Sequence, residues 1–382
     1  MPYKHHYHRL LISAVLLLVP IFAPAQYFAA ESEVERLLMA DSAALHLTID
    51  NYNFLWNNEF FGPIDKGYTL IGFNLQPALE YHFTPSIKAK AGVRLTKYSG
   101  LDKFTDCLPV YSVTWHTEKL AVTMGTIDGA SFHRLPEPVM HRERQLVNNY
   151  ENGMQIVYNT NRLFADVWVD WQDFIFRGDN KKEQIYGGLS VGWKALSSDA
   201  LELEIPASFT IFHRGGQIDT DTTPMRLFYY VSGGARLNHH LDGFISGVGA
   251  SSQVIGYKDN SPTPESLYHS GWGWLSDVRL MHEKSSLSVG YWLADSFIAQ
   301  QGNPMYMCKS YDGTTDQQKR SMLTGELNLA KDITDYFTAA LTAVGYYDIK
   351  NSAFDYTYAF TFILRPDFVL WRQKSITTNH YK

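Results

Sequence analysis

The stretch YTYAFTFIL, residues 356–364, alternates large apolar side chains with mostly smaller ones. A β-strand points successive side chains to opposite faces, so one face of this stretch carries Tyr, Tyr, Phe, Phe and Leu. Similar alternation recurs along the chain in stretches of roughly 9 to 14 residues. The pattern predicts an all-β fold, a transmembrane antiparallel up-and-down β-barrel whose apolar face lies in lipid. A soluble sandwich or propeller also alternates, but so large an aromatic face would then need a cover.

The expected barrel has about sixteen strands, with fourteen or eighteen as alternatives. The expected strands are residues 45–58, 67–82, 86–97, 108–116, 119–127, 151–159, 162–173, 184–196, 201–212, 225–237, 243–256, 271–281, 286–297, 320–330, 335–347 and 353–365.

The joints between these strands alternate in length. Short joints such as His82 to Ser86 are rich in turn-forming residues, whereas joints such as Asp128 to Tyr150 are long. Bacterial outer-membrane barrels have short turns on the periplasmic rim and longer loops on the outer rim. An even number of strands then puts both barrel termini on the periplasmic rim of a Gram-negative outer membrane.

The strand at 86–97 separates its two faces clearly. Its odd-numbered positions from 87 to 95 are apolar, whereas Lys88, Lys90 and Arg94 lie on the other face. A Lys or Arg on the lipid face near the midplane costs roughly 2–4 kcal/mol, so the basic face is expected to point into the lumen. The candidate lumen-lining residues are Lys88, Lys90, Arg94, Asp166, Asp170, Glu202, Glu204 and Glu326. They would either keep the lumen wet or set a transverse field that selects ions.

The N-terminus has the features of an export signal. Lys4 and Arg9 give a basic start, an apolar core follows at residues 10–19, and small residues at 23 and 25 form a cleavage site. The expected organisation is a signal peptide at 1–25, a short N-terminal segment at 26–44 for which a helix is one option, the barrel at 45–371 and a polar C-terminal tail at 372–382.

In architecture the chain resembles Gram-negative outer-membrane barrels of general-porin type. The resemblance covers most of the exported chain and rests on strand number and alternating rims, without a diagnostic residue motif. In those porins the long third external loop, between strands five and six, folds into the lumen and narrows it. The resemblance therefore implies a constriction loop at residues 128–150, although the usual acidic signature is missing there. The candidate residues of this loop are His133, Arg134, Glu137, His141, Arg142, Glu143 and Arg144. The alternative is a solvated external loop with ordinary charges.

Few residues in the sequence suggest chemistry. A G-x-S-x-G elbow, a convincing Ser/His/Asp arrangement and zinc-type Cys/His spacing are all missing from it. We therefore expect no enzyme, no cofactor and no metal, with a membrane-embedded hydrolase kept as an alternative. A net charge of −6 without a basic stripe argues against nucleic-acid binding. Cys107 and Cys308 both fall in expected long loops, and the sequence leaves open whether they pair.

The expected function is a porin-like passive channel for small hydrophilic solutes, governed by the width and electrostatics of the lumen. The expected partners are outer-membrane lipid and small hydrophilic solutes. Two further questions stay open. The barrel could instead anchor a secretion, surface-assembly or adhesion complex, and it could form a homo-oligomer.

Overall fold

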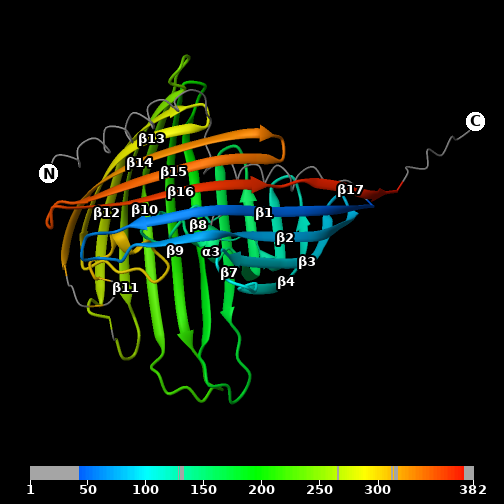
Figure 1. Ribbon diagram of the computed structural model, residues 1–382, viewed down its shortest axis with the longest axis horizontal. Coiled ribbons are helices and arrows are strands. Elements are labelled where there is room, and N and C mark those ends of the chain that lie inside the picture. Colours follow the sequence, from blue (N-terminus) through cyan, green and yellow to red (C-terminus); the bar gives the residue numbers. More distant parts are fainter. Residues whose placement is uncertain are drawn as a thin grey trace, which may run out of the picture.

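Neighbouring strands of the sequence pair with one another, and the last strands pair with the first, so the sheet closes into a barrel (Figure 1). The computed structural model describes residues 43–127, 129, 133–264, 266–310, 313 and 317–373. The expected signal peptide, nearly all of the expected N-terminal segment and the tail from 374 onward lie outside the described residues.

The described elements agree with the expected strands to within a few residues at most ends. They are β1 (Ala44–Glu59), β2 (Tyr68–Thr84), β3 (Ile87–Tyr98), β4 (Asp106–His116), β5 (Leu120–Ile127), α3 (Arg144–Val147), β6 (Glu151–Asn159), β7 (Leu163–Asp173), β8 (Glu183–Ser197), β9 (Leu201–Gly215), β10 (Arg226–His240), β11 (Gly247–Asp259), β12 (Ser270–His282), β13 (Ser285–Asp295), η1 (Pro304–Tyr306), β14 (Lys319–Thr334), β15 (Phe337–Asp348), β16 (Ala353–Leu364) and β17 (Asp367–Arg372).

Barrel closure depends on an interrupted last strand. Residues 51–59 of β1 pair with β16, and residues 44–48 pair with β17. Both pairings are antiparallel. Pro366 separates β16 from β17, and since proline has no backbone N–H it suits a break in the pairing. Its carbonyl still accepts a hydrogen bond from the N–H of Ile49 at 3.1 Å. The described sheet has 17 strands, and counting β16 and β17 as one strand confirms the expected sixteen.

Both ends of the barrel lie on the rim with the short turns. Ala44 is paired with His82 on one side, next to the β2–β3 turn, and with Arg372 on the other side. We call this end the short-turn rim and the opposite end the long-loop rim. The strands of the near wall cross those of the far wall in Figure 1, as the tilt of barrel strands requires.

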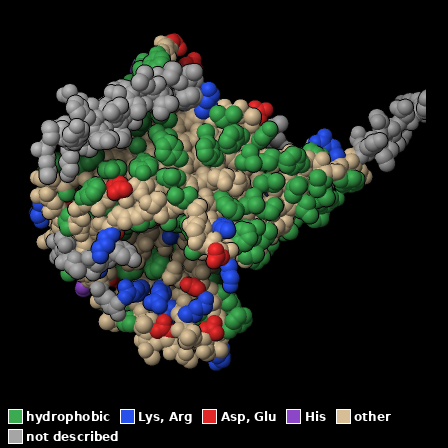
Figure 2. Space-filling model, in the orientation of Figure 1, with side chains coloured by type: hydrophobic (Ala, Val, Ile, Leu, Met, Phe, Trp, Pro, Cys, Tyr) green, Lys and Arg blue, Asp and Glu red, His purple; other side chains and the backbone are tan. Residues whose placement is uncertain are grey.

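The two faces of the wall differ in polarity as expected. On β16, Thr357 and Ala359 are buried in the lumen, whereas Phe360 and Phe362 are exposed on the outside. Figure 2 shows hydrophobic side chains over the wall around β1, β2 and β17, and a hollow in which charged side chains gather. None of the helices within the described residues is long and apolar enough to cross a bilayer. Cys107 is exposed and Cys308 is buried, and both are free thiols.

Two long joints fill the lumen towards the long-loop rim. We call the described parts of these joints, residues 133–150 and 296–310, the plug. The wall contributes large inward side chains to a shared core, among them Trp168 and Trp292. The plug contributes Phe297 and Met305 to the same core, and all four side chains are almost fully buried. This half of the barrel is therefore packed like a protein interior.

Candidate functional site

The outward face of β1 carries a cluster of polar side chains near the long-loop rim. The inward side chains Phe54 and Trp56 pack on the plug, so the odd-numbered positions beside them face outward. Asn57 is one of these, and its Nδ2 donates to Glu59 Oε1 at 2.9 Å. Thr69 Oγ1, on the neighbouring strand β2, donates to Asn57 Oδ1. We call Asn57, Glu59 and Thr69 the outer cluster.

The outer cluster lies on a surface where polar groups are costly. The directly neighbouring outward side chains on β16 are Tyr356 and Tyr358, and Ile71 follows Thr69 on β2. Asn57 is only 5% exposed and Glu59 is half-buried, whereas Thr69 is exposed. Polar and ionisable groups on a lipid-facing wall are rare and usually functional. The outer cluster is thus a candidate functional site.

A second pair of polar side chains continues the outward face of β1 towards the short-turn rim. Asn53 Nδ2 donates to Asn51 Oδ1 at 2.7 Å, and Asn51 Nδ2 donates to the carbonyl of Asn74 at 2.8 Å. Their cross-strand neighbours include Phe73 and Phe362. Asn51 and Asn53 satisfy part of one another's hydrogen-bonding capacity, so they are less costly in lipid than isolated amides.

On the inward face of the same strands a different set of polar groups is bound to the plug. Asn58 Oδ1 accepts hydrogen bonds from Trp56 Nε1 at 3.0 Å and from Thr357 Oγ1 at 2.6 Å. Glu143 Oε2 of the plug accepts from Asn58 Nδ2 at 3.3 Å and from the hydroxyl of Tyr68 at 2.6 Å. We call Asn58, Tyr68, Glu143 and Thr357 the inner cluster.

His133 fixes the plug to the far wall. Its side chain has no exposed surface, with Nδ1 2.7 Å from Asp166 Oδ2 and Nε2 2.8 Å from Glu151 Oε2. Its ring also stacks on Trp168 with a centroid distance of 3.8 Å. Burial alone would lower the pKa of His133, but the carboxylates of Glu151 and Asp166 raise it to about 10. At neutral pH it is therefore an imidazolium that donates from both nitrogens.

Arg142 fixes the plug to another part of the wall. Its guanidinium lies 3.1 Å from Glu326 on β14 and 3.6 Å from Glu137 within the plug. Asn303, from the second joint of the plug, donates to Glu137 Oε1 at 2.9 Å. His141 Nε2 lies 3.7 Å from Glu137 Oε1, yet burial lowers the pKa of His141 to about 4. We regard His141 as neutral at pH 7, because the burial is nearly complete and 3.7 Å is too long for a hydrogen bond.

The expected loop and lumen residues thus meet one another directly. His133–Asp166 and Arg142–Glu326 each join one expected loop residue to one expected wall residue. Other expected wall residues form pairs with neighbouring strands: Lys88 with Glu80 at 3.0 Å, Glu202 with Lys194 at 2.9 Å and Glu204 with Arg236 at 2.7 Å. Asp170 accepts from Gln172 and from the N–H of Asn152.

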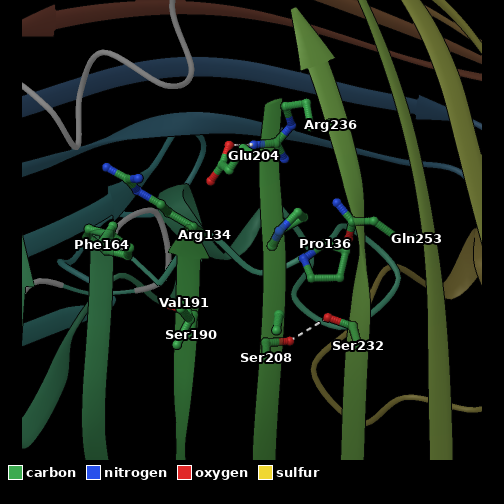
Figure 3. Close-up of a pocket in the computed structure, with 13 residues that line it drawn as sticks. Arg134, Pro136, Phe164, Ser190, Val191, Glu204, Ser208, Ser232, Arg236 and Gln253 are labelled. Carbon is green, nitrogen blue, oxygen red and sulfur yellow. Dashed lines mark hydrogen bonds and ion pairs between the residues drawn. The ribbon is translucent and has the colours of Figure 1, made fainter. Parts of the chain in front are cut away.

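The side chain of Arg134, from the plug, lines a small luminal pocket. Its guanidinium lies over the ring of Phe164, 3.6 Å from the centroid. Figure 3 shows Arg134 beside the Glu204–Arg236 pair, with the Ser208–Ser232 hydrogen bond further along the same wall. Arg144, in α3, is partly buried, and Lys90 makes no ion pair within the described residues.

The outer cluster was not predicted from the sequence. A signal was present, because Asn51, Asn53, Asn57 and Glu59 share the face of β1 on which Leu45, Leu47, Ile49 and Leu55 also lie. A lipid-facing row should stay apolar, so this run of polar positions marks β1 as exceptional. Within the described residues, no group of three or more His, Cys, Asp and Glu side chains has the geometry to hold a metal ion.

The architecture is that of outer-membrane β-barrels. The crystal structure of OccK1 (OpdK) from Pseudomonas aeruginosa is 10% identical to the chain, with 85% of this chain and 99% of that chain aligned and a TM-score of 0.50. The structure of Pseudomonas aeruginosa OpdK with vanillate gives the same values. The outer membrane protein OprD of Pseudomonas aeruginosa is 9% identical, with 87% and 97% aligned and a TM-score of 0.49. At these identities the likeness concerns the fold alone.

The family is more specific than the fold. The family described as lipid A 3'-O-deacylase-type matches residues 37–373, which is nearly all of the barrel, and the chain belongs to this family. A search of curated proteins finds no match. The expectation that the chain is not an enzyme is therefore wrong, because the family is one of deacylases. The expectation rested on the lack of a serine elbow and of a Ser/His/Asp arrangement in the sequence, and these are not the only catalytic groups that a hydrolase can use.

Proposed function

We propose that the protein is an outer-membrane hydrolase that removes an acyl chain from lipid A, and that the outer cluster performs the reaction. The family description supports the substrate class. The observation that carries the choice of site is a carboxylate on the lipid-facing wall, hydrogen-bonded to an amide and linked through it to a hydroxyl. A membrane glycolipid approaches a barrel from the side, so its ester would meet the outside of the wall and not the lumen.

The proposed chemistry is general base hydrolysis. Glu59 takes a proton from a water molecule, and the water oxygen attacks the carbonyl carbon of the ester. Asn57 Nδ2 has two N–H groups, of which one donates to Glu59 and the other is left to stabilise the oxyanion. Thr69 binds Asn57 Oδ1 and so fixes which edge of the amide faces Glu59. The bond between the carbonyl carbon and the sugar oxygen then breaks, and Glu59 returns the proton to that oxygen.

The plug gives the proposed site a rigid support. Asn57 and Asn58 are adjacent in β1, so the hydrogen bonds of Asn58 to Trp56, Thr357 and Glu143 fix the backbone from which Asn57 projects. Catalytic groups need positioning to within a fraction of an ångström, which buried and satisfied neighbours provide. Under this proposal the expected loop residues His133, Arg142 and Glu143 are structural.

A passive channel is the second candidate, and the plug argues against it. The wall core around Trp292 and the plug residues Phe297 and Met305 pack together inside the lumen. Passage of hydrophilic solutes needs a wet opening, which a packed apolar core does not offer. In the proposed orientation the short-turn rim is periplasmic. The outer cluster, near the long-loop rim, then lies at the level of the outer leaflet.

The test is a deacylation assay on the purified full-length protein in vesicles that contain lipid A. Mass spectrometry would follow loss of an acyl chain, and fragmentation would locate the cleaved ester. Glu59→Gln keeps the shape of the side chain but removes the base, so we expect the rate to fall by roughly 10²–10⁴-fold.

The matched control is Glu283→Gln in the exposed β12–β13 turn, which should keep the full rate. Both variants should show the heat-dependent gel migration of a folded barrel. A wild-type protein that releases no fatty acid would refute the hydrolase, and a fully active Glu59→Gln would refute the site alone.

A further inference from the structure

A second polar cavity lies inside the barrel, between the plug and the wall of β1, β2 and β3. Its lining includes Asp50 on β1, Gln76 on β2, Arg94 on β3 and the plug residues Gln145 and Asn149. Nearer the long-loop rim, Leu146 of α3 packs in an apolar cluster with Phe54 and Trp56. The cavity and the outer cluster are on opposite faces of the wall, so they are separate sites.

Two polar groups in this cavity make no hydrogen bond with any described residue. Arg94 is only 6% exposed, and it makes no hydrogen bond or ion pair with any described residue. Asn149 Oδ1 is buried and also accepts no hydrogen bond. A buried guanidinium without a partner is costly, since nearly all buried polar groups in proteins are satisfied. An unsatisfied donor and an unsatisfied acceptor that line one cavity point to a ligand with complementary groups.

The charges define the class of ligand. The cavity also holds Arg365, but its Nε donates to Asp50 Oδ1 at 2.9 Å, so these two charges compensate one another. Asp50 is also the strongest charge acting on Arg94, and Asp106 acts on Arg94 from outside the lining. The lining therefore holds two cations, Arg94 and Arg365, against one carboxylate, Asp50. One positive charge is in excess, and Arg94 is the cation whose guanidinium makes no hydrogen bond with a described residue; its planar fork matches a carboxylate.

We propose that this cavity is a binding site for a small hydroxycarboxylate. The carboxylate lies against Arg94, and a hydroxyl donates to Asn149 Oδ1 while the amides of Gln76 and Gln145 surround it. The site requires no access from the lipid and is independent of the proposed deacylation.

The test uses glycolate as the probe, because it combines one carboxylate with one hydroxyl. Binding to the full-length barrel in detergent is measured by isothermal titration and by saturation-transfer NMR. Glycolamide, which has the same shape without the charge, should bind at least tenfold more weakly. Arg94→Gln should weaken glycolate binding roughly tenfold or more.

The matched control is Lys90→Gln, a lumen-facing base on the same strand that does not line the cavity. It should bind glycolate as the wild type does, and so should Glu59→Gln. If Arg94→Gln fails to fold, Arg94→Lys replaces it, and the loss of the planar fork should still weaken binding. Equal binding of glycolamide, unchanged binding by the Arg94 variants or no binding of glycolate at all would overturn the proposal.

Discussion

The two faces of β1 at the long-loop rim use similar polar side chains in different ways. On the outside, the hydrogen bonds of Asn57 to described residues are those with Glu59 and Thr69; Asn57 is 5% exposed and Thr69 is exposed. On the inside, Asn58 makes three hydrogen bonds to Trp56, Thr357 and Glu143, and it is buried.

The difference separates support from chemistry. A group whose hydrogen bonds are all made within the protein stabilises the fold and has little capacity left for a substrate. A polar group that is kept on a lipid-facing wall costs stability, and it persists where it serves a function. We therefore interpret the inner face and the plug as support, and the outer cluster as the reactive part.

The largest effect is expected from breaking the support at His133. His133→Ala leaves the carboxylates of Glu151 and Asp166 buried without their cation. Loss of one member of a buried charge pair costs roughly 3–5 kcal/mol, so the free energy of unfolding should fall by about that amount. Urea unfolding of the protein in vesicles measures this. His269→Ala, in an exposed loop, should change little, and an equal loss in both variants would contradict the structural role of His133.

The comparison between the two faces is tested most directly by adjacent substitutions. Asn57→Leu should lower the deacylation rate by roughly 10²-fold or more, since it removes the proposed oxyanion donor. Its cost in stability should be smaller than that of Asn58→Leu, because its partners Glu59 and Thr69 are not fully buried. Asn58→Leu should instead destabilise the protein by about 1–3 kcal/mol, because it leaves the buried donors of Trp56 and Thr357 without their acceptor. Paired assays of rate and unfolding decide the outcome. The comparison fails if Asn58→Leu lowers the rate as strongly as Asn57→Leu without loss of stability.

The fold could be predicted from the sequence because the pattern of side chains within each strand shows which face is apolar and where the strand ends. Alternation fixes which residues face lipid, as for residues 356–364, and turn residues fix where strands end. The candidate site could not be predicted in this way. The register of β1 with β2 brings Thr69 beside Asn57 and Glu59. The three polar side chains are unusual because that face of the sheet is the outer one. The partners of the plug are also far apart in the sequence, since Arg142 meets Glu326 across 184 positions.

A smaller effect is expected from pH. The pKa of His133, about 10, lies above its ordinary value of 6.5. The stabilisation from its charge is therefore complete below pH 6.5 and is lost as the pH rises through 10. The unfolding free energy should fall between pH 7 and pH 10 by more in the wild type than in His133→Gln. A pH dependence that is the same in both proteins would show that other groups cause it.

The smallest effect is expected from Asn53→Leu, which tests how far the reactive surface extends along the outside of β1. Asn53 lies four residues from Asn57 on the same face of β1, towards the short-turn rim, and among the described residues its side chain hydrogen-bonds to Asn51. If the outer cluster is the whole site, the deacylation rate should stay within about twofold of wild type. Stability should remain within roughly 0.5 kcal/mol or rise slightly, because a leucine on the lipid face avoids the cost of burying an amide. A rate that falls tenfold without loss of folding would extend the site to Asn51 and Asn53, and would mean that this polar row contacts the bound lipid.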